Sequence, residues 1–250
     1  MARACETGNT NGVLPRPLLS STDSCAADHR MNIIFDLDGT LIDSAPDIQS
    51  VASTVLEKLG KNGLTLDETR SFIGEGSAVF VRRMMSVRGI NEAQHTHTAL
   101  HEDFVAQYEF SVDKAVFYPD VIATLTALKA DGHRLGLCTN KPEAPTRAVI
   151  RHMEIQSMFE AVMAAGMINS RKPDPAMLLK TIEDLGGGPT LYVGDSEVDA
   201  ETASRAGVRL ALFSEGYRKT PVSEIQHDWV FSEFSSLPAI VTKAMLLERR

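Results

Sequence analysis

Short apolar runs alternate along the chain with longer segments in which apolar residues recur three and four positions apart. The runs fall near residues 33–35, 134–138, 159–164, 190–193, 208–213 and 229–231. Runs that are apolar on both faces predict buried strands of a parallel sheet, and the longer segments predict helices. This alternation predicts an α/β fold, a doubly wound parallel sheet with connecting helices on both of its faces.

One region departs from the alternation. Between residues 45 and 115 the pattern predicts helices from about Ser44 to Gly60 and near 66–72, 77–87 and 92–108, with no strand among them. Ser44 has a side chain suited to capping the first of these helices. We therefore expect residues 45–115 to form a separate all-helical cap domain. Residues 31–44 and 116–250 would form the α/β core.

The first thirty residues show neither pattern. Residues 1–30 are rich in Ser, Thr, Asn, Gly and Pro, and they lack the apolar stretch of a secretory signal. Met31 stands directly before the first predicted strand. We expect a disordered tail or a start assigned too far upstream. A targeting or regulatory arm is the alternative, although no particular residue supports it.

Composition narrows the class of protein only modestly. The 250 residues are 43% hydrophobic and 23% charged, as in ordinary globular proteins, and no apolar run is long enough to span a membrane. The net charge of −8 argues weakly against nucleic acid or an anionic membrane as partner, but it does not exclude an anionic substrate. Three cysteines form no plausible disulfide framework, which favours a reducing, cytoplasmic location.

Two acidic residues follow the first predicted strand. Asp36 and Asp38 follow the run Ile33-Ile34-Phe35, and Gly39 permits a sharp turn after them. Side chains two apart on a strand point the same way, so both carboxylates can converge beyond the carboxyl end of the strand. Converging carboxylates repel each other and favour a cation such as Mg²⁺. The alternative is that the two aspartates only open a turn.

Polar residues also follow three later predicted elements. Thr139 ends the strand near 134–138, Lys172 lies in a loop before Pro173, and Asp195 and Asp199 follow the strand near 190–193. Taken singly, each has an ordinary explanation as a strand-end threonine, a solvated lysine or a helix N-cap. Their order after an Asp-x-Asp strand is what makes them informative.

These four segments together resemble the four motifs of the haloacid dehalogenase-like hydrolases, a superfamily of mostly Mg²⁺-dependent phosphatases. The resemblance implies hydrolysis of a phosphate monoester through an aspartyl-phosphate. In it, Asp36 is the nucleophile and Asp38 the general acid and base, while Thr139 and Lys172 bind the phosphoryl oxygens. Dehalogenases lack an aspartate at the position of Asp38, so phosphoryl chemistry is favoured over dehalogenation.

The same resemblance implies the metal ligands. Mg²⁺ would be held by Asp36, the backbone carbonyl of Asp38 and Asp195. Asp199 would order the water molecules around the metal, or Lys172. A non-catalytic regulatory protein on the same fold is a different possibility. The complete set of six motif residues argues against it, because degenerate relatives usually lose at least one of them.

Three further details resemble the phosphoglycolate phosphatases of this superfamily. They are Gly74-Glu75-Gly76 in the cap, Asn140-Lys141-Pro142 after Thr139, and Gly216-Tyr217 after a core strand. The resemblance implies conversion of 2-phosphoglycolate to glycolate and phosphate. The implied substrate-binding residues are Gly74, Glu75, Gly76, Thr139, Asn140 and Lys172. A phosphatase of sugar phosphates or pyrophosphate, and a phosphomutase, remain as alternatives.

Two groups in the predicted cap invite functional interpretations. His95, His97 and His101 lack the partners of a recognisable zinc motif, so we expect an exposed helix surface there. Arg82 and Arg83 could reach a substrate carboxylate, although most helical arginines are solvated. The expected partner is a small phosphorylated metabolite, and we expect a monomer or a homodimer.

Overall fold

The structure is a computed structural model, and it describes residues 30–248. The segment predicted to be an N-terminal tail lies outside the described residues, except for Arg30. No helix within residues 30–248 combines the length and the apolar character needed to cross a lipid bilayer.

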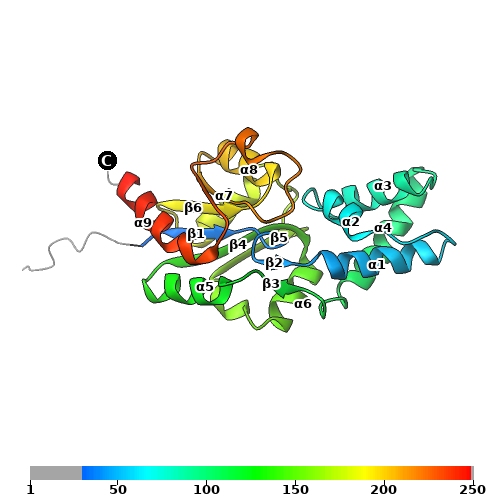
Figure 1. The fold of residues 1–250 in the computed structure, drawn as a ribbon, viewed down its shortest axis with the longest axis horizontal. Coiled ribbons are helices and arrows are strands. Elements are labelled where there is room, and N and C mark those ends of the chain that lie inside the picture. The colour runs from blue at the N-terminus through cyan, green and yellow to red at the C-terminus, as the bar shows by residue number, and fades with distance from the viewer. Residues whose placement is uncertain (1–29, 249–250) are drawn as a thin grey trace, which may run out of the picture.

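A parallel sheet forms the centre of the molecule (Figure 1). Its strand order within the described residues is β5-β4-β1-β6-β7-β8, so β1 lies in the middle and pairs in parallel with β4 and β6. The predicted α/β class is confirmed. The strands are β1 (Asn32–Phe35), β4 (Arg134–Pro142), β5 (Ala161–Ala165), β6 (Thr190–Gly194), β7 (Arg209–Phe213) and β8 (Trp229–Phe231).

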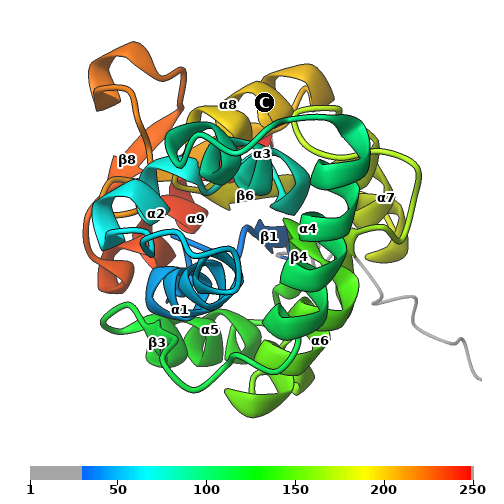
Figure 2. The ribbon, with the colours of Figure 1, turned by 90° about the vertical axis from the view of Figure 1, so that its right-hand side faces the viewer.

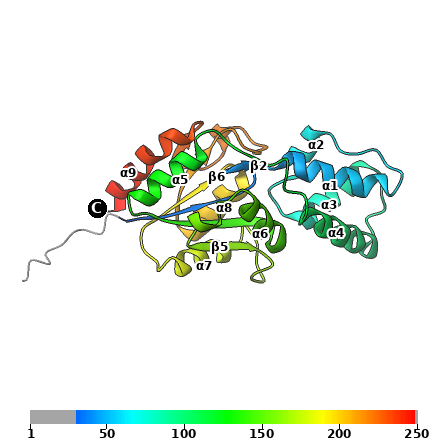
Figure 3. The ribbon, with the colours of Figure 1, turned by 90° about the horizontal axis from the view of Figure 1, so that it is seen from below.

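Helices cover both faces of this sheet (Figure 3) because its strands are apolar on both sides. Ile33 and Phe35 pack toward α5, α6 and α9, whereas Ile34 between them packs toward α7 and α8. The core helices are α5 (Val121–Ala130), α6 (Glu143–His152), α7 (Ala176–Asp184), α8 (Glu197–Ala206) and α9 (Leu237–Glu248), and the 3₁₀ turns are η1 (Gln156–Met158), η2 (Val222–Glu224) and η3 (Phe234–Ser236).

Four helices stand apart from the sheet, beyond the carboxyl ends of its strands (Figures 1 and 2). They are α1 (Ala45–Glu57), α2 (Leu66–Phe72), α3 (Ser77–Val87) and α4 (Gln94–Tyr108). Their apolar faces form a hydrophobic cluster of their own, and Tyr217 joins this cluster from the core. We call α1–α4 the cap. The exact boundaries at 44 and 116 stay a prediction.

A small ladder at the base of the cap was not predicted. The chain enters the cap through β2 (Ile42–Asp43) and returns through β3 (Val116–Phe117), and these two strands pair in antiparallel fashion. Two-residue strands carry too little alternation to be seen in a sequence. The ladder places the two connections between core and cap side by side.

Two local predictions are corrected. Ser44 stands at the N-cap position of α1, but its side chain caps nothing; its hydroxyl donates to Asp38 Oδ1 at 2.6 Å. The strand that was expected to end at Thr139 continues to Pro142, with a register shift against β5 between these residues.

The expectation of an exposed histidine surface on α4 is wrong for His97. Its side chain is buried, and its Nε2 lies 2.8 Å from the carbonyl oxygen of Ala78 on α3. His101 is half-buried and bonds through Nε2 to the hydroxyl of Ser77, while His95 is exposed as predicted. These contacts join α4 to α3, so the two inward histidines serve cap packing.

Candidate active site

The turn after β1 places the two predicted catalytic aspartates. Asp36 continues the strand, and its backbone N–H donates to Val193 of β6 at 2.9 Å. Gly39 then turns with φ of +87°, and a Cβ there would lie 2.6 Å from Asp195 Oδ2. Only glycine combines this backbone conformation with such a close approach. The turn therefore brings Asp36 directly beside the end of β6.

A cluster of buried carboxylates forms where β1 and β6 end. Oxygens of Asp36, Asp195 and Asp199 lie within 4.8 Å of one another. Asp195 is oriented by the Thr40 hydroxyl, which donates to Oδ1 at 2.8 Å, and by the backbone N–H of Tyr217, which donates to Oδ2 at 2.6 Å. The structure thus brings together the acidic residues that the sequence predicted, although their roles as ligands stay a prediction.

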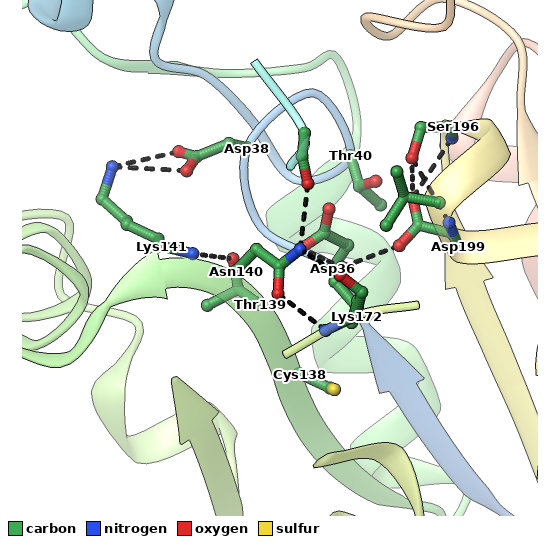
Figure 4. A network of polar contacts seen from close by, with 12 residues as sticks. Asp36, Asp38, Thr40, Cys138, Thr139, Asn140, Lys141, Lys172, Ser196 and Asp199 are labelled. Atoms are coloured by element: carbon green, nitrogen blue, oxygen red, sulfur yellow. Dashed lines mark hydrogen bonds and ion pairs between the residues drawn. The ribbon is translucent and has the colours of Figure 1, made fainter. Parts of the chain in front are cut away.

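Lys172 is fully buried beside this cluster (Figure 4). Its Nζ lies 2.9 Å from Asp36 Oδ1 and 2.7 Å from Asp199 Oδ1, and it also donates to the Tyr192 hydroxyl at 2.9 Å. Burial alone would lower the pKa of Lys172, but the carboxylates of Asp199 and Asp36 outweigh it and hold that pKa above its ordinary value. Lys172 is therefore an ammonium ion placed against the predicted nucleophile.

The pKa shifts of the carboxylates indicate that this cluster lacks positive charge. Burial raises the pKa of Asp36 to about 7, against the opposing effect of Lys172, and burial followed by repulsion from Asp199 and Asp36 raises that of Asp195 well above its usual range. Asp36 Oδ1 is also buried without a well-oriented hydrogen bond, although Lys172 is near enough for an ion pair. Excess negative charge and an unsatisfied oxygen fit a divalent cation with oxygen ligands.

Asp199 has a different environment from the other two carboxylates. Burial opposes its ionised form, but the Lys172 ammonium and the hydroxyls of Ser196 and Tyr192 together lower its pKa. Its Oδ2 accepts the backbone N–H and the hydroxyl of Ser196, which completes a capping box at the start of α8. These partners occupy the oxygens of Asp199, and its predicted role beside the metal stays a prediction.

Asp38 points away from the carboxylate cluster (Figure 4). Its Oδ1 accepts the Ser44 hydroxyl and lies 3.1 Å from Nζ of Lys141. Lys141 is buried and also donates to the hydroxyl of Tyr108, at the end of α4. The predicted site residues did not include Lys141. The available signal was the triplet Asn140-Lys141-Pro142, from which only Asn140 was predicted to bind substrate.

Asn140 ties three parts of the site together. Its Nδ2 donates to the carbonyl oxygens of Gly74, in the cap, at 3.1 Å and of Lys172 at 3.0 Å. Its Oδ1 accepts the backbone N–H of Lys172 at 2.9 Å. The hydroxyl of neighbouring Thr139 is buried and accepts the N–H of Lys141 at 3.2 Å. Asn140 thus fixes the Lys172 loop and contacts the cap at once.

A cavity of ≈ 50 Å³ lies between these strand ends and the cap. Its floor is polar and includes both aspartates, while its walls are apolar side chains of the cap. Gly74 and Gly76 border it, and their predicted role in binding substrate stays a prediction. The lining residues are Asp36, Asp38, Ile48, Ile73, Gly74, Gly76, Ser77, Phe80, Phe104, Tyr108, Thr139, Asn140, Lys141 and Pro142.

The structure does not bring Glu75 to this cavity with its two glycine neighbours. Its carboxylate pairs with Arg83 and lies 3.2 Å from Nζ of Lys219. Arg83 also donates to the carbonyl of Phe72, whereas Arg82 is exposed on α3. Glu75 therefore orders the loop from outside, and neither arginine is poised over the cavity.

Gly216 and Tyr217 join the carboxylate cluster to the base of the cap. A Cβ on Gly216 would lie 2.3 Å from Asp195 Oδ2 and from the carbonyl oxygen of Gly39, so no side chain fits. The Tyr217 hydroxyl donates to Asp43 Oδ1 at 2.5 Å and accepts the N–H of Ala45 at 3.0 Å. The sequence resemblance singled out this pair but gave no physical role for it.

Comparison with known proteins agrees with this geometry. The family model described as "Haloacid dehalogenase-like hydrolase" matches residues 33–213. A phosphoglycolate phosphatase of Cereibacter sphaeroides is 41% identical over 216 residues, covering 85% of this chain and 98% of the relative. A phosphoglycolate phosphatase of Rhodobacter capsulatus is 41% identical over 209 residues, covering 84% and 95%.

Solved structures show the same architecture. A predicted phosphoglycolate phosphatase from Haemophilus somnus superposes with a TM-score of 0.80 at 26% identity, covering 86% of this chain and 99% of that one. The matched segment contains all four motifs, and the relatives are covered almost from end to end. The chain therefore belongs to the haloacid dehalogenase-like hydrolases and is an enzyme of the phosphatase class.

Proposed function

We propose that this phosphatase hydrolyses 2-phosphoglycolate to glycolate and phosphate, with Mg²⁺ and through an aspartyl-phosphate on Asp36. The observation that carries the proposal is the mostly apolar cavity that places both aspartates opposite the side chains of the cap. The names of the relatives at 41% identity support the choice of substrate. A cytoplasmic location is proposed from the unpaired, buried Cys138 together with the low cysteine content.

In the first step, a carboxylate oxygen of Asp36 attacks phosphorus while the bond from phosphorus to the glycolate oxygen breaks. Asp38 gives a proton to the departing oxygen, for which its position on the cavity side is suitable. The Lys172 ammonium, 2.9 Å from Asp36, offsets the negative charge that gathers on the phosphoryl oxygens. Thr139 adds a hydroxyl at the same strand edge.

In the second step, Asp38 takes a proton from a water molecule whose oxygen attacks the phosphorus of the aspartyl-phosphate. The bond between Asp36 and phosphorus breaks, which releases phosphate and restores the carboxylate. When bound by Asp36, Asp195 and the backbone carbonyl of Asp38, Mg²⁺ would supply charge neutralisation at the phosphoryl group. Asp199 holds Lys172 at 2.7 Å and thereby keeps it aligned throughout.

The lining of the cavity favours a small acid over a sugar phosphate. The cap-side walls formed by Ile48, Phe80 and Phe104 are apolar and offer few partners to the hydroxyl groups of a hexose phosphate. The same argument disfavours a phosphomutase, which must hold a sugar bisphosphate. The choice of 2-phosphoglycolate over pyrophosphate rests on the names of the relatives.

The test is a comparison of kcat/KM for 2-phosphoglycolate, glucose 6-phosphate and pyrophosphate, with Mg²⁺ and after its removal by EDTA. We expect 2-phosphoglycolate to be preferred by at least about tenfold and EDTA to abolish turnover until Mg²⁺ is restored. A flat profile, or a preference for the sugar phosphate, would remove the substrate assignment and leave the phosphatase class. Undiminished turnover in EDTA would contradict the metal requirement.

A further inference from the structure

A substrate with a carboxylate poses an electrostatic problem in this cavity. The site already holds several buried aspartates, so the second negative group of the substrate needs a cation of its own. Most cations near the strand ends are committed elsewhere. Lys172 lies between Asp36 and Asp199, Arg70 pairs with Asp43 at 2.8 Å, and Arg83 and Lys219 pair with Glu75.

Lys141 is also paired, with Asp38, but it differs from these cations because it lines the cavity. Among the described residues that line the cavity it is the positively charged one, and its side chain is only 2% exposed. Its Nζ lies 3.1 Å and 3.4 Å from the two oxygens of Asp38, and 4.0 Å from the centre of the Tyr108 ring. A lysine buried beneath the cap, on the cavity side of Asp38, is costly unless its charge is used.

We infer that Lys141 determines specificity by binding the carboxylate of the substrate, the part that leaves with the alkoxide. The inference rests on the proposed function, because it assumes that the substrate carries such a group. Asp38 is the partner of the departing oxygen, and Lys141 lies directly against Asp38, so the remainder of a two-carbon substrate falls beside Lys141. Arg82 and Arg83, which the sequence suggested for this task, do not line the cavity.

The surroundings of Lys141 suit a small carboxylate and little else. Tyr108 lines the same cavity, and its hydroxyl contacts Nζ, so a carboxylate beside Lys141 also faces a second polar group. The rest of the wall is apolar, with Ile48, Phe80 and Phe104 from the cap. A neutral group at this position would gain no ion pair with the ammonium.

The test compares 2-phosphoglycolate with 2-hydroxyethyl phosphate, which replaces the carboxylate by a neutral hydroxymethyl group. The measured quantity is the ratio of their kcat/KM values in the wild type and in Lys141→Met. Both substrates lose whatever Lys141 gives to Asp38, but 2-phosphoglycolate alone loses an ion pair. We expect the ratio to fall by about 10- to 100-fold, the usual effect of one charge-assisted contact. Inhibition by glycolate should weaken by a similar factor.

Lys180→Met is the matched control, because Lys180 is an exposed lysine on α7 that pairs with Glu183 and Asp184. It should leave the ratio as in the wild type. Lys141→Gln, whose amide can still donate to Asp38 and Tyr108, replaces the methionine variant if thermal melting shows that variant to be unfolded.

The outcomes separate the two proposals. A wild-type ratio near one removes 2-phosphoglycolate as the preferred substrate, and with it the proposed function. A high wild-type ratio that persists in the Lys141 variants leaves the proposed function standing and overturns the inference. An equal loss for both substrates also overturns it, since Lys141 would then act only through Asp38.

Discussion

Asp36 and Asp38 are two residues apart, yet their surroundings separate their tasks. Asp36 is deeply buried, with Lys172 beside it and two further carboxylates within reach. Asp38 is held on the cavity side by the Ser44 hydroxyl and the Lys141 ammonium. In the proposed mechanism, Asp36 would face phosphorus and Asp38 the departing oxygen. Environment, rather than residue type, distinguishes a nucleophile from an acid.

Replacing Asp36 by Asn tests the nucleophile. The amide keeps the shape of the side chain but cannot form the acyl phosphate, so we expect kcat to fall by more than about 10³-fold. The melting temperature should not fall, because the variant removes a carboxylate whose pKa burial raises to about 7. Steady-state kinetics and calorimetry measure both quantities. Turnover like that of the wild type would refute the assignment.

Replacing Gly216 by Ala tests the contact that fixes Asp195. The new Cβ would lie 2.3 Å from Asp195 Oδ2 and from the Gly39 carbonyl oxygen. Relieving the second contact requires the backbone to move, which costs more energy than moving a side chain. We expect a lower melting temperature and at least a tenfold loss of kcat/KM. Half-maximal activity should also need a higher Mg²⁺ concentration than in the wild type. Gly60→Asn is the control, because φ is +66° there and nothing lies near its Cβ position. Equal effects in both variants would contradict the steric argument.

At the scale of elements, the strands were the most predictable part of the molecule. A buried parallel strand must be apolar on both faces, so its end is visible as the first polar residue after the run. Asp36 and Asp195 were located in this way. The sequence also indicated α1–α4 through their periodicity. The architecture was therefore largely readable from local patterns.

Contacts between segments that are distant in the chain could not be predicted from the sequence. The pairing of β2 with β3 joins residues far apart in the chain, and each strand has only two residues. His97 looked like a surface residue because nothing in its own helix reveals that Ala78 covers it. The sequence resemblance included Lys141, but it gave this lysine no role, because that role depends on Asp38 and Tyr108 around it. Tertiary packing decides such cases.

The capping box at the start of helix α2 contributes to the stability of the protein. Thr65 and Glu68 form a capping box, and the Glu68 carboxylate also binds Arg88 at 2.6 Å and 2.9 Å. The hydrogen bond from Arg88 and that from the backbone of Thr65 lower the pKa of Glu68 to about 2. The folded state therefore favours the ionised carboxylate. The associated stability is complete above about pH 5 and is lost as pH falls toward 2.

Replacing Glu68 by Gln should expose this dependence. Near neutral pH we expect the variant to be less stable by about 1 kcal/mol, a value reduced for solvent screening of a partly exposed pair. The two proteins should converge as pH falls to about 2 and below, where the carboxylate of the wild type also becomes protonated. Denaturant unfolding at a series of pH values measures this, with Glu92→Gln at an exposed position as the control. A difference independent of pH would contradict the electrostatic explanation.

At the scale of the whole molecule, the site belongs to both parts of the chain. The core supplies the carboxylates and Lys172, while the cap supplies the apolar walls of the cavity. Asn140 joins the parts through Gly74, and Tyr217 joins them through Asp43. At this junction the ammonium of Lys172 does not balance the negative charge of the three clustered carboxylates. Global stability is therefore linked to what binds there.

Mg²⁺ should stabilise the whole protein more strongly at about pH 8 than at about pH 5. The folded pKa of Asp36, about 7, exceeds its ordinary value of 3.8, so the metal-free native state retains a proton that the unfolded chain releases. That contribution is present at low pH and lost as pH rises toward 7. A cation needs the ionised form, and at one hundred times its Kd it would add about 2.7 kcal/mol.

Thermal melting with and without millimolar Mg²⁺ at the two pH values measures this effect. Asp36→Asn is the control, because it removes both the titrating group and a proposed ligand, and its melting temperature should respond little to Mg²⁺. An equal shift of the wild type at both pH values would contradict the competition between proton and metal.

The ladder between β2 and β3 also bears on how such enzymes diversify. Asp43 and Val116 are direct partners across the ladder, so the chain leaves the core and returns to it at one point. The apolar cluster of the cap is separate from those of the core, apart from Tyr217. An entire cap can therefore be exchanged for another by cutting at two adjacent positions, with the chemistry of the sheet left in place. Recombination at these positions offers a direct route to new substrates.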